Sequence, residues 1–318
     1  MRIAVMGAGA MGSAFGGYLA LAGHDVTLVD VRRECVDAVN DRGLLLRLPG
    51  GEERQVALSA ATDPSGLAHL DLVIVLTKAF ATADAARSLK GVVGAATWVV
   101  TLQNGIGNDR ALAAVLGAER VVGGTTTVGA EQTEPGTTTV APSTASGDTV
   151  TYLGTPPGAA GAEVTRVAEV LTAAGLPAVV LPSAEEAVWT KVALAAPMAS
   201  ISAVLGWTVA DVYRNPHTRQ LLRTLFDEIM AVAAARRVLV DPDTVWGYCE
   251  HTWQTVGPHM TSMAVDVRRG RRTEIDALNL EVARLGEAAG VPAPANRSLG
   301  LLVQALEAPE ASPLVRSR

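Results

Sequence analysis

The sequence predicts an α/β protein in two parts, a doubly wound parallel sheet followed by an all-helical domain. Two observations lead to this prediction. Strand-like and helix-like segments alternate from residue 2 to about residue 183, a pattern typical of a mostly parallel sheet with helices on both faces. Beyond that point the apolar residues recur with helical spacing only. We therefore expect a sheet domain over 1–183 and a helical domain over 184–318.

Composition narrows the class of protein before any motif is considered. The 318 residues suffice for two domains, and with 49% hydrophobic and 18% charged residues the chain has an ordinary globular composition. The net charge of −6 gives no electrostatic reason to expect a nucleic-acid partner. Cys35 and Cys249 match neither a disulfide framework nor a metal-binding spacing. Because the first predicted strand begins at residue 2, we expect no signal peptide. We expect a cytoplasmic protein without a metal site; its oligomeric state is not fixed by the sequence, although a homodimer is compatible with it.

The first segment carries the most specific motif. Arg2–Met6 is predicted to be a buried strand, and a glycine-rich turn follows it where a helix begins, with the sequence Gly7-Ala8-Gly9-Ala10-Met11-Gly12. This is the Rossmann-type dinucleotide-binding fingerprint. Its first glycine allows the tight turn, its second lets a pyrophosphate approach, and its third lets the helix pack closely. The pyrophosphate would lie on the helix amides. The alternative is a turn that serves only helix–strand packing.

An acid closes the second predicted strand, His24–Asp30. Asp30 lies where a carboxylate accepts hydrogen bonds from the ribose hydroxyls of the dinucleotide. Such an acid repels a 2′-phosphate and therefore favours NAD. Arg32 and Arg33 follow directly and could restore NADP binding. We expect NAD or NADP as cofactor, with NAD slightly favoured by Asp30.

Short apolar runs and the residues that interrupt them predict the rest of the sheet domain. Helices are expected over 33–41, 81–89, 111–116 and 163–174, and strands over 43–48, 55–58, 72–76, 97–102, 125–130, 136–141, 149–153 and 178–181. The Thr- and Gly-rich strands between 124 and 155 are expected to pair antiparallel. Thr77 and Lys78 follow one buried strand and Asn104 follows the next, so we expect all three at the carboxyl edge of the sheet, where such folds bind ligands.

Four helices are predicted in the second half, over 185–205, 221–238, 246–253 and 276–289. Residues 192–210 carry no charged side chain and are about long enough to span a bilayer. Pro197, several small polar residues and many alanines interrupt this stretch, which favours a helix buried on all sides between two domains. We therefore expect no membrane association.

Lys191 is the last charged residue before that uncharged stretch. A buried lysine is costly, so it usually has a partner or a lowered pKa, and either would suit a general acid that protonates a carbonyl oxygen as hydride arrives. The alternative is a lysine that extends from the helix end to solvent. Further on, Glu274 lies between Thr273 and Asp276, which resemble a capping box. Glu274 either stabilises that helix start or is the carboxylate partner of Lys191.

The motifs together resemble those of the ketopantoate reductases, also called 2-dehydropantoate 2-reductases, over nearly the whole chain. The resemblance depends on five sets of residues, namely Gly7–Gly12, Thr77-Lys78-Ala79, Leu102-Gln103-Asn104-Gly105, Trp189-Thr190-Lys191, and Ser262-Met263 with Thr273-Glu274-Ile275-Asp276. It implies NADPH-dependent reduction of a 2-keto acid to a 2-hydroxy acid, as in pantothenate biosynthesis. It also implies a helical domain of the type shared with 6-phosphogluconate dehydrogenase.

The resemblance further implies roles for particular residues. Lys191 would be the general acid and Glu274 would assist it. Lys78 and Asn104 would line the cofactor and substrate crevice, and Ser262 would help bind the substrate.

Three positions depart from the family pattern. Ala195 and Ala199 stand one and two helical turns after Lys191, where the family usually has asparagines, and His259 replaces an asparagine three residues before Ser262. Losing an amide that binds a substrate hydroxyl removes about 1–3 kcal/mol of recognition. Alanines leave room for a bulkier or more apolar substrate. We therefore expect the reductase chemistry to be retained while ketopantoate itself is in question.

Two other functions remain open on the sequence alone. The first keeps the fold and acts on a larger 2-keto acid, a 3-hydroxy acid or an imine. The second is a catalytically silent nucleotide-binding protein, which the presence of both Lys191 and Glu274 disfavours.

Overall fold

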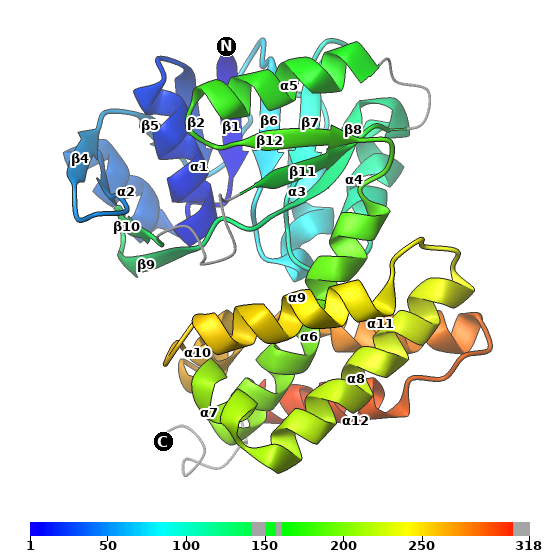
Figure 1. Cartoon of the computed structure of the whole chain (residues 1–318). Helices are drawn as coiled ribbons and strands as arrows, with labels where there is room; N and C mark the ends of the chain where they lie inside the picture. Colours follow the sequence, from blue (N-terminus) through cyan, green and yellow to red (C-terminus); the bar gives the residue numbers. More distant parts are fainter. Residues whose placement is uncertain (142–149, 157–160, 308–318) are drawn as a thin grey trace. The chain divides into compact units, whose positions relative to one another are not determined.

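The computed structural model describes residues 1–141, 150–156 and 161–307, and it divides into two compact units (Figure 1). The first unit contains Met1–Gln103 and the described residues from Gly107 to Ala184. The second contains Asn104–Ile106 and the described residues from Glu185 onward. The predicted strand over 149–153 begins outside the described residues, as does the tail from residue 308.

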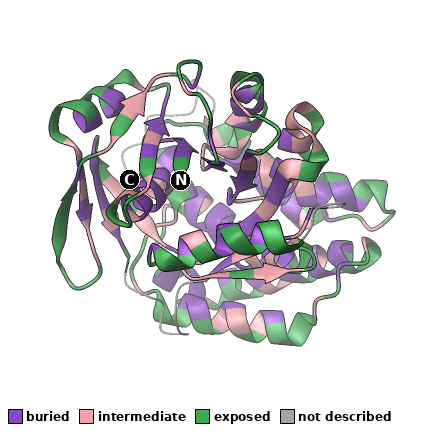
Figure 2. Ribbon diagram, turned by 90° about the horizontal axis from the view of Figure 1, so that it is seen from above, coloured by how far each residue is buried: buried purple, intermediate pink, exposed green. Residues whose placement is uncertain are grey.

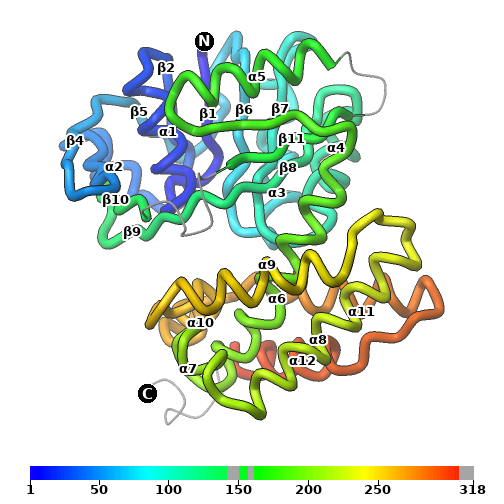
Figure 3. The backbone as a smooth tube through the Cα atoms, in the orientation of Figure 1, coloured from blue at the N-terminus to red at the C-terminus, as the bar shows by residue number. Residues whose placement is uncertain are grey.

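An eight-stranded sheet forms the centre of the first unit, with the strand order β12-β11-β8-β7-β6-β1-β2-β5 (Figure 3). Its members are β1 (Arg2–Met6), β2 (Asp25–Val29), β5 (Ser59–Ala61), β6 (Leu72–Val75), β7 (Trp98–Thr101), β8 (Val121–Thr126), β11 (Thr151–Gly154) and β12 (Ala178–Leu181). From β5 to β8 all neighbours are parallel, whereas β11 is antiparallel to β8 and parallel to β12. The predicted doubly wound sheet is confirmed, and its antiparallel pairing is limited to one side.

The central strands are apolar because helices cover both faces of the sheet. Those helices are α1 (Ala10–Leu21), α2 (Arg33–Arg42), α3 (Thr82–Leu89), α4 (Asn108–Leu116) and α5 (Gly161–Ala173). In β1, Ile3 and Val5 join the core that contains α1 and α5 residues, while Ala4 and Met6 join the core that contains α3 and α4 residues. Figure 2 shows the result as buried strands and helices with alternating buried and exposed bands.

A second sheet of four strands packs against α1, in the order β4-β3-β10-β9. Its members are β3 (Leu44–Arg47), β4 (Glu53–Val56), β9 (Ala130–Glu134) and β10 (Thr137–Val140). A Cβ on Gly16 would lie 2.5 Å from Leu28 of the large sheet, and one on Gly17 would lie 2.4 Å from Leu46 of the small sheet. Two adjacent glycines therefore let α1 fit closely between the two sheets.

The predicted single strand over 125–130 is wrong. The chain leaves the large sheet at Thr126 and enters the small sheet only at Ala130. Between them the Thr126 hydroxyl accepts a hydrogen bond from the Val128 amide at 3.2 Å, which turns the backbone. The polar, Thr-rich sequence carries no apolar alternation that would mark this change of sheet.

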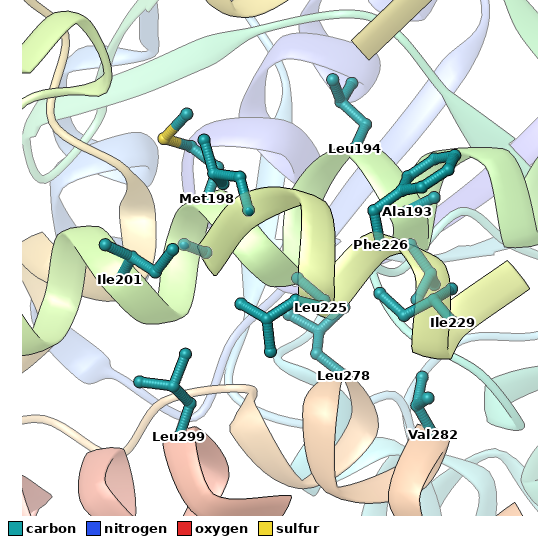
Figure 4. Close-up of a cluster of buried hydrophobic side chains, with 14 of the residues drawn as sticks. Ala193, Leu194, Met198, Ile201, Leu225, Phe226, Ile229, Leu278, Val282 and Leu299 are labelled. Atoms are coloured by element: carbon teal, nitrogen blue, oxygen red, sulfur yellow. The ribbon is translucent and has the colours of Figure 1, made fainter. Parts of the chain in front are cut away.

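The second unit is helical and is built around α6 (Glu185–Leu205). Its other helices are α7 (Val209–Arg214), α8 (Pro216–Ala235), α9 (Pro242–Thr255), α10 (Ser262–Arg268), α11 (Asn279–Ala288) and α12 (Pro294–Glu307). Figure 4 shows α6 side chains such as Leu194 and Ile201 among residues of α8, α11 and α12. Helix α6 is long and apolar enough to cross a membrane by composition, but 67% of its apolar window is buried, as expected for the core helix of this unit.

Local caps explain why several helices differ from the predicted ranges. Helix α8 begins at Pro216 because the Asn215 side chain accepts from two amides of its first turn. Helix α9 begins at Pro242, after Asp241, whose side chain accepts from the Thr244 amide. The short helices α7 and α10 and the terminal α12 were not predicted.

The predicted capping box formed by Thr273 and Asp276 is wrong. The Thr273 hydroxyl bonds to the Glu307 carboxylate and accepts from the Ile275 amide, and Asp276 pairs with Arg272. This segment forms a 3-10 turn, η3 (Ile275–Ala277), before α11 begins.

Candidate active site

The glycine-rich turn between β1 and α1 is fixed by two of its three glycines. Gly7 has a φ of +101°, and a Cβ there would lie 2.9 Å from the Leu76 carbonyl oxygen at the end of β6. A Cβ on Gly12 would lie 1.7 Å from the Gly7 carbonyl oxygen. Both positions therefore require glycine for the turn itself and for the close approach of α1.

Gly9 is different, because neither backbone strain nor packing in the described structure requires glycine there. Its φ of −78° suits any residue, and the nearest atom to a Cβ at this position would be a terminal nitrogen of Arg32, at 3.9 Å. Gly9 is the N-cap of α1, and no side-chain cap of this helix is found among the described residues. The turn thus combines open space with the amides of a helix N-terminus, which is the arrangement that receives a pyrophosphate. The residues present fit a dinucleotide.

Asp30, directly after β2, is held by several donors and is only 8% exposed. One carboxylate oxygen accepts from the Ala8 amide at 2.7 Å and from a terminal nitrogen of Arg32 at 2.9 Å. The other accepts from the backbone amide and the Nε of Arg32, at 2.9 and 3.0 Å. Burial alone would raise the pKa of Asp30, but the hydrogen bonds and charge of Arg32, with the Ala8 amide, lower it below its usual value. Asp30 and Arg32, which the sequence treats as competing influences, form one ion pair.

The side chain of Gln103 links the carboxyl ends of β6 and β7. Its amide nitrogen donates to the Thr77 carbonyl and to the Thr82 hydroxyl, each at 2.8 Å, and its amide oxygen accepts from Thr101 at 2.9 Å. Gln103 was not predicted as a site residue. A polar residue directly after an apolar strand is the signal that could have identified it. It positions the segment that carries Thr77 and Lys78.

Lys78 and Asn104 follow β6 and β7, as expected. Lys78 is half-buried and precedes the 3-10 turn η1 (Ala79–Ala81). Asn104–Ile106 packs within the second unit, where the Ile106 amide donates to the Ala277 carbonyl at 2.9 Å. A Cβ on Gly105, whose φ is +94°, would lie 2.5 Å from that same oxygen. The segment that follows Asn104 is thus held by a close backbone contact with Ala277 of η3.

Lys191 lies half-buried in the first half of α6. Burial lowers the pKa of Lys191 below its ordinary value of 10.5, and the nearby Cys249 thiol partly opposes this shift. No ion pair of Lys191 with a carboxylate is found in the part of the chain that the structure describes. The pairing of Lys191 with Glu274 therefore stays a prediction. Glu274 itself is 9% exposed and lies at the start of η3.

The remaining predicted substrate residues belong to the same helical unit. Ala195 and Ala199 follow Lys191 at intervals of four residues, so the three share one face of α6. Ser262 is exposed as the first residue of α10, a helix that packs against α6. His259 is exposed, and its carbonyl accepts from the Val209 amide at the start of α7 at 2.8 Å. Their contact with a substrate stays a prediction.

The open turn on a parallel sheet makes the first unit a dinucleotide-binding domain. Comparison with known proteins is more specific. The family model for "Ketopantoate reductase PanE/ApbA" matches residues 3–157, and the model for its C-terminal part matches residues 183–307. The chain belongs to the ketopantoate reductase family, and it is a nicotinamide-dependent oxidoreductase.

Curated relatives named 2-dehydropantoate 2-reductase match over nearly their full length. The protein of Halobacterium salinarum is 34% identical and that of Archaeoglobus fulgidus 32% identical, each over 96% of this chain and 98% of the relative.

Two solved structures have the same fold over 96% of this chain. A D-mandelate dehydrogenase in complex with NADH and anilino(oxo)acetate has a TM-score of 0.91 at 28% identity, and it covers 96% of this chain and 98% of its own. A ketopantoate reductase from Ralstonia eutropha has a TM-score of 0.87 at 32% identity, with the same coverage of both chains.

Proposed function

We propose that this protein reduces a 2-keto acid to the corresponding 2-hydroxy acid, and that Lys191 supplies the proton. The observation that carries the proposal is the location of Lys191, a half-buried lysine on the core helix α6. Burial lowers the pKa of this lysine. The names of the curated relatives support the class of substrate, because they are 2-dehydropantoate 2-reductases.

The first unit provides the residues that would hold the cofactor. The amides at the start of α1 and the open position at Gly9 would hold the pyrophosphate, and Asp30 with Arg32 would lie beside the adenosine ribose. When bound, the nicotinamide supplies the hydride. Gln103 holds the Thr77 segment, so that Lys78 keeps a fixed position at the same edge of the sheet.

Lys191 then performs the acid step. As C2 of the keto acid gains hydride, the electron pair of its carbonyl bond moves to oxygen, and the Lys191 ammonium gives that oxygen a proton. A general acid works best when its pKa lies near the working pH, and the lowered pKa moves Lys191 in that direction. Glu274 positions the lysine, and Asn104 and Ser262 hold the substrate. Solvent returns the proton to Lys191 after turnover.

The proposed reaction has two candidate substrates. Ketopantoate is the substrate in the names of the curated relatives. A bulkier, more apolar 2-keto acid is favoured by Ala195 and Ala199, and by the likeness to a D-mandelate dehydrogenase that binds anilino(oxo)acetate. The alanines remove the polar partners that asparagines would offer on the face of α6 that carries Lys191.

The test is the loss of nicotinamide absorbance with purified protein, using ketopantoate and phenylglyoxylate in parallel with NADH and NADPH. The double variant Ala195→Asn, Ala199→Asn is the matched comparison. If the alanines select an apolar substrate, the native protein prefers phenylglyoxylate and the variant moves toward ketopantoate by about tenfold or more. Cofactor binding without turnover of any 2-keto acid would contradict the proposed reaction.

A further inference from the structure

Asp30 has no acceptor position left for a ribose hydroxyl in the described arrangement. A carboxylate offers about four lone-pair sites, and Asp30 already accepts hydrogen bonds from the Ala8 amide and from three nitrogens of Arg32. A diol can therefore reach Asp30 only if the Arg32 side chain moves away. This side chain is 38% exposed, so it has solvent to move into.

Gln132 is the residue that holds Arg32 in place from the other side. It belongs to β9 of the small sheet, and its amide nitrogen donates to the Ala8 carbonyl at 2.7 Å. Its amide oxygen accepts from the remaining terminal nitrogen of Arg32, at 3.4 Å. Ala8, Asp30, Arg32 and Gln132 thus form a closed ring of hydrogen bonds around the first turn of the dinucleotide site.

The two states of this ring suit different cofactors. With Arg32 over Asp30, the acid is neutralised and saturated, and a guanidinium faces the place of the ribose, which suits a 2′-phosphate. With Arg32 withdrawn, Asp30 regains its acceptors and suits the free hydroxyls of NADH. Withdrawing Arg32 breaks its side-chain hydrogen bonds to Asp30 and also its hydrogen bond to Gln132. A third residue that fixes Arg32 therefore adds to the cost of the change and can shift the balance between the two states.

We propose that Gln132 is a cofactor-specificity residue, which acts by holding Arg32 against Asp30 and so lowers the affinity for NADH relative to NADPH. The inference rests on the proposed function, because it requires a nicotinamide cofactor at the Gly7–Gly12 turn. Gln132 acts through Arg32 and is a positioning residue.

The experiment measures the dissociation constants of NADH and NADPH separately, by fluorescence titration of the enzyme without substrate. Gln132→Leu removes both hydrogen bonds at similar volume, with Gln132→Met as a second variant should the first not fold. The matched control is Glu131→Ala, an exposed position on the same strand. We expect both Gln132 variants to lower the ratio of the NADH constant to the NADPH constant about fivefold, and the control to leave it unchanged.

A purely structural role for Gln132 gives a different result. If it only supports the turn through the Ala8 carbonyl, its loss weakens both cofactors by the same factor and the ratio stays constant, which would overturn the proposal. In an Arg32→Ala background the Gln132→Leu change should no longer alter the ratio, since the residue it acts through is gone; a full fivefold change there would also overturn it. Failure of the native protein to bind either cofactor would instead refute the proposed function and the inference together.

Discussion

The two units have opposite effects on the charged forms of their key side chains. The first unit stabilises the charge of Asp30, and the second disfavours the charge of Lys191. In the first unit, hydrogen bonds and the charge of Arg32 overcome the effect of burial on Asp30 and lower its pKa, so the ionised form is stabilised. In the second unit, burial dominates at Lys191 and lowers its pKa, so the charged form is disfavoured. A binding site benefits from a charge that stays fixed, whereas an acid catalyst benefits from a proton that leaves easily.

The largest expected effect comes from removing the lysine. Lys191→Met should reduce turnover about 10²-fold or more, because no other group would supply the proton. Cofactor affinity should stay unchanged, since the Gly7–Gly12 turn, Asp30 and Arg32 lie in the other unit. Steady-state kinetics with a separate cofactor titration measures both quantities. Near-normal turnover in the variant would remove Lys191 from the mechanism.

The next prediction compares two glycines of the Gly7–Gly12 turn, one that matters for cofactor binding and one that matters for folding. Gly9→Val should weaken cofactor binding about tenfold or more while the protein keeps its native melting temperature, because its side chain would enter the open space expected for the pyrophosphate. Gly12→Ala is the contrasting variant and should destabilise the fold, since its Cβ would clash with the Gly7 carbonyl. If Gly9→Val binds cofactor normally, the open position has another purpose.

A smaller effect concerns the stability supplied by Asp30. Asp30→Asn should lower the free energy of unfolding by about 2 kcal/mol at neutral pH, because it loses hydrogen bonds to a charged partner. A lowered carboxyl pKa stabilises the fold above the unfolded-state pKa of 3.8, and this contribution disappears as the pH falls through the lower folded-state pKa. Denaturant unfolding of both proteins over an acid pH series should show the two curves converging; a constant difference would contradict the pKa shift.

The smallest effect is expected at Cys249, beside Lys191. Burial and Glu250 raise the pKa of this thiol to about 12, although Lys191 opposes the shift. The thiolate is the reactive form of cysteine, so native Cys249 should resist alkylation at neutral pH and react only after unfolding. Mass spectrometry after brief iodoacetamide treatment measures this directly. Rapid native labelling at Cys249 would show that the surroundings of Lys191 are open to solvent, which would remove the cause of its lowered pKa.

The sequence was informative where local pattern decides structure. The strand β6 was predicted because five consecutive apolar residues, Leu72–Leu76, stand between polar segments. The turn at Gly7 was predicted because its glycines are spaced for a dinucleotide. It was less informative where a side-chain contact depends on the course of the backbone between its partners. Asp30 and Arg32 were both selected, but their pairing depends on how the chain turns after β2.

Gln132 was not foreseen because it reaches Ala8 across 124 positions of sequence. Its location depends on the small sheet, in which β10 pairs in parallel with β3, and no local pattern specifies that pairing. For the same reason the sequence predicted one strand over 125–130, where the chain passes from the large sheet at Thr126 to the small sheet at Ala130.

The pH dependence of kcat for 2-keto acid reduction is the most direct test of Lys191 as the acid. The lowered pKa of Lys191 predicts that kcat falls as the pH rises, with an apparent pKa below the ordinary lysine value of 10.5, because the deprotonated amine cannot give a proton. The residual activity of Lys191→Met should lack this alkaline decline. A native profile that stays flat up to 10.5, or a decline that persists in the variant, would contradict the assignment.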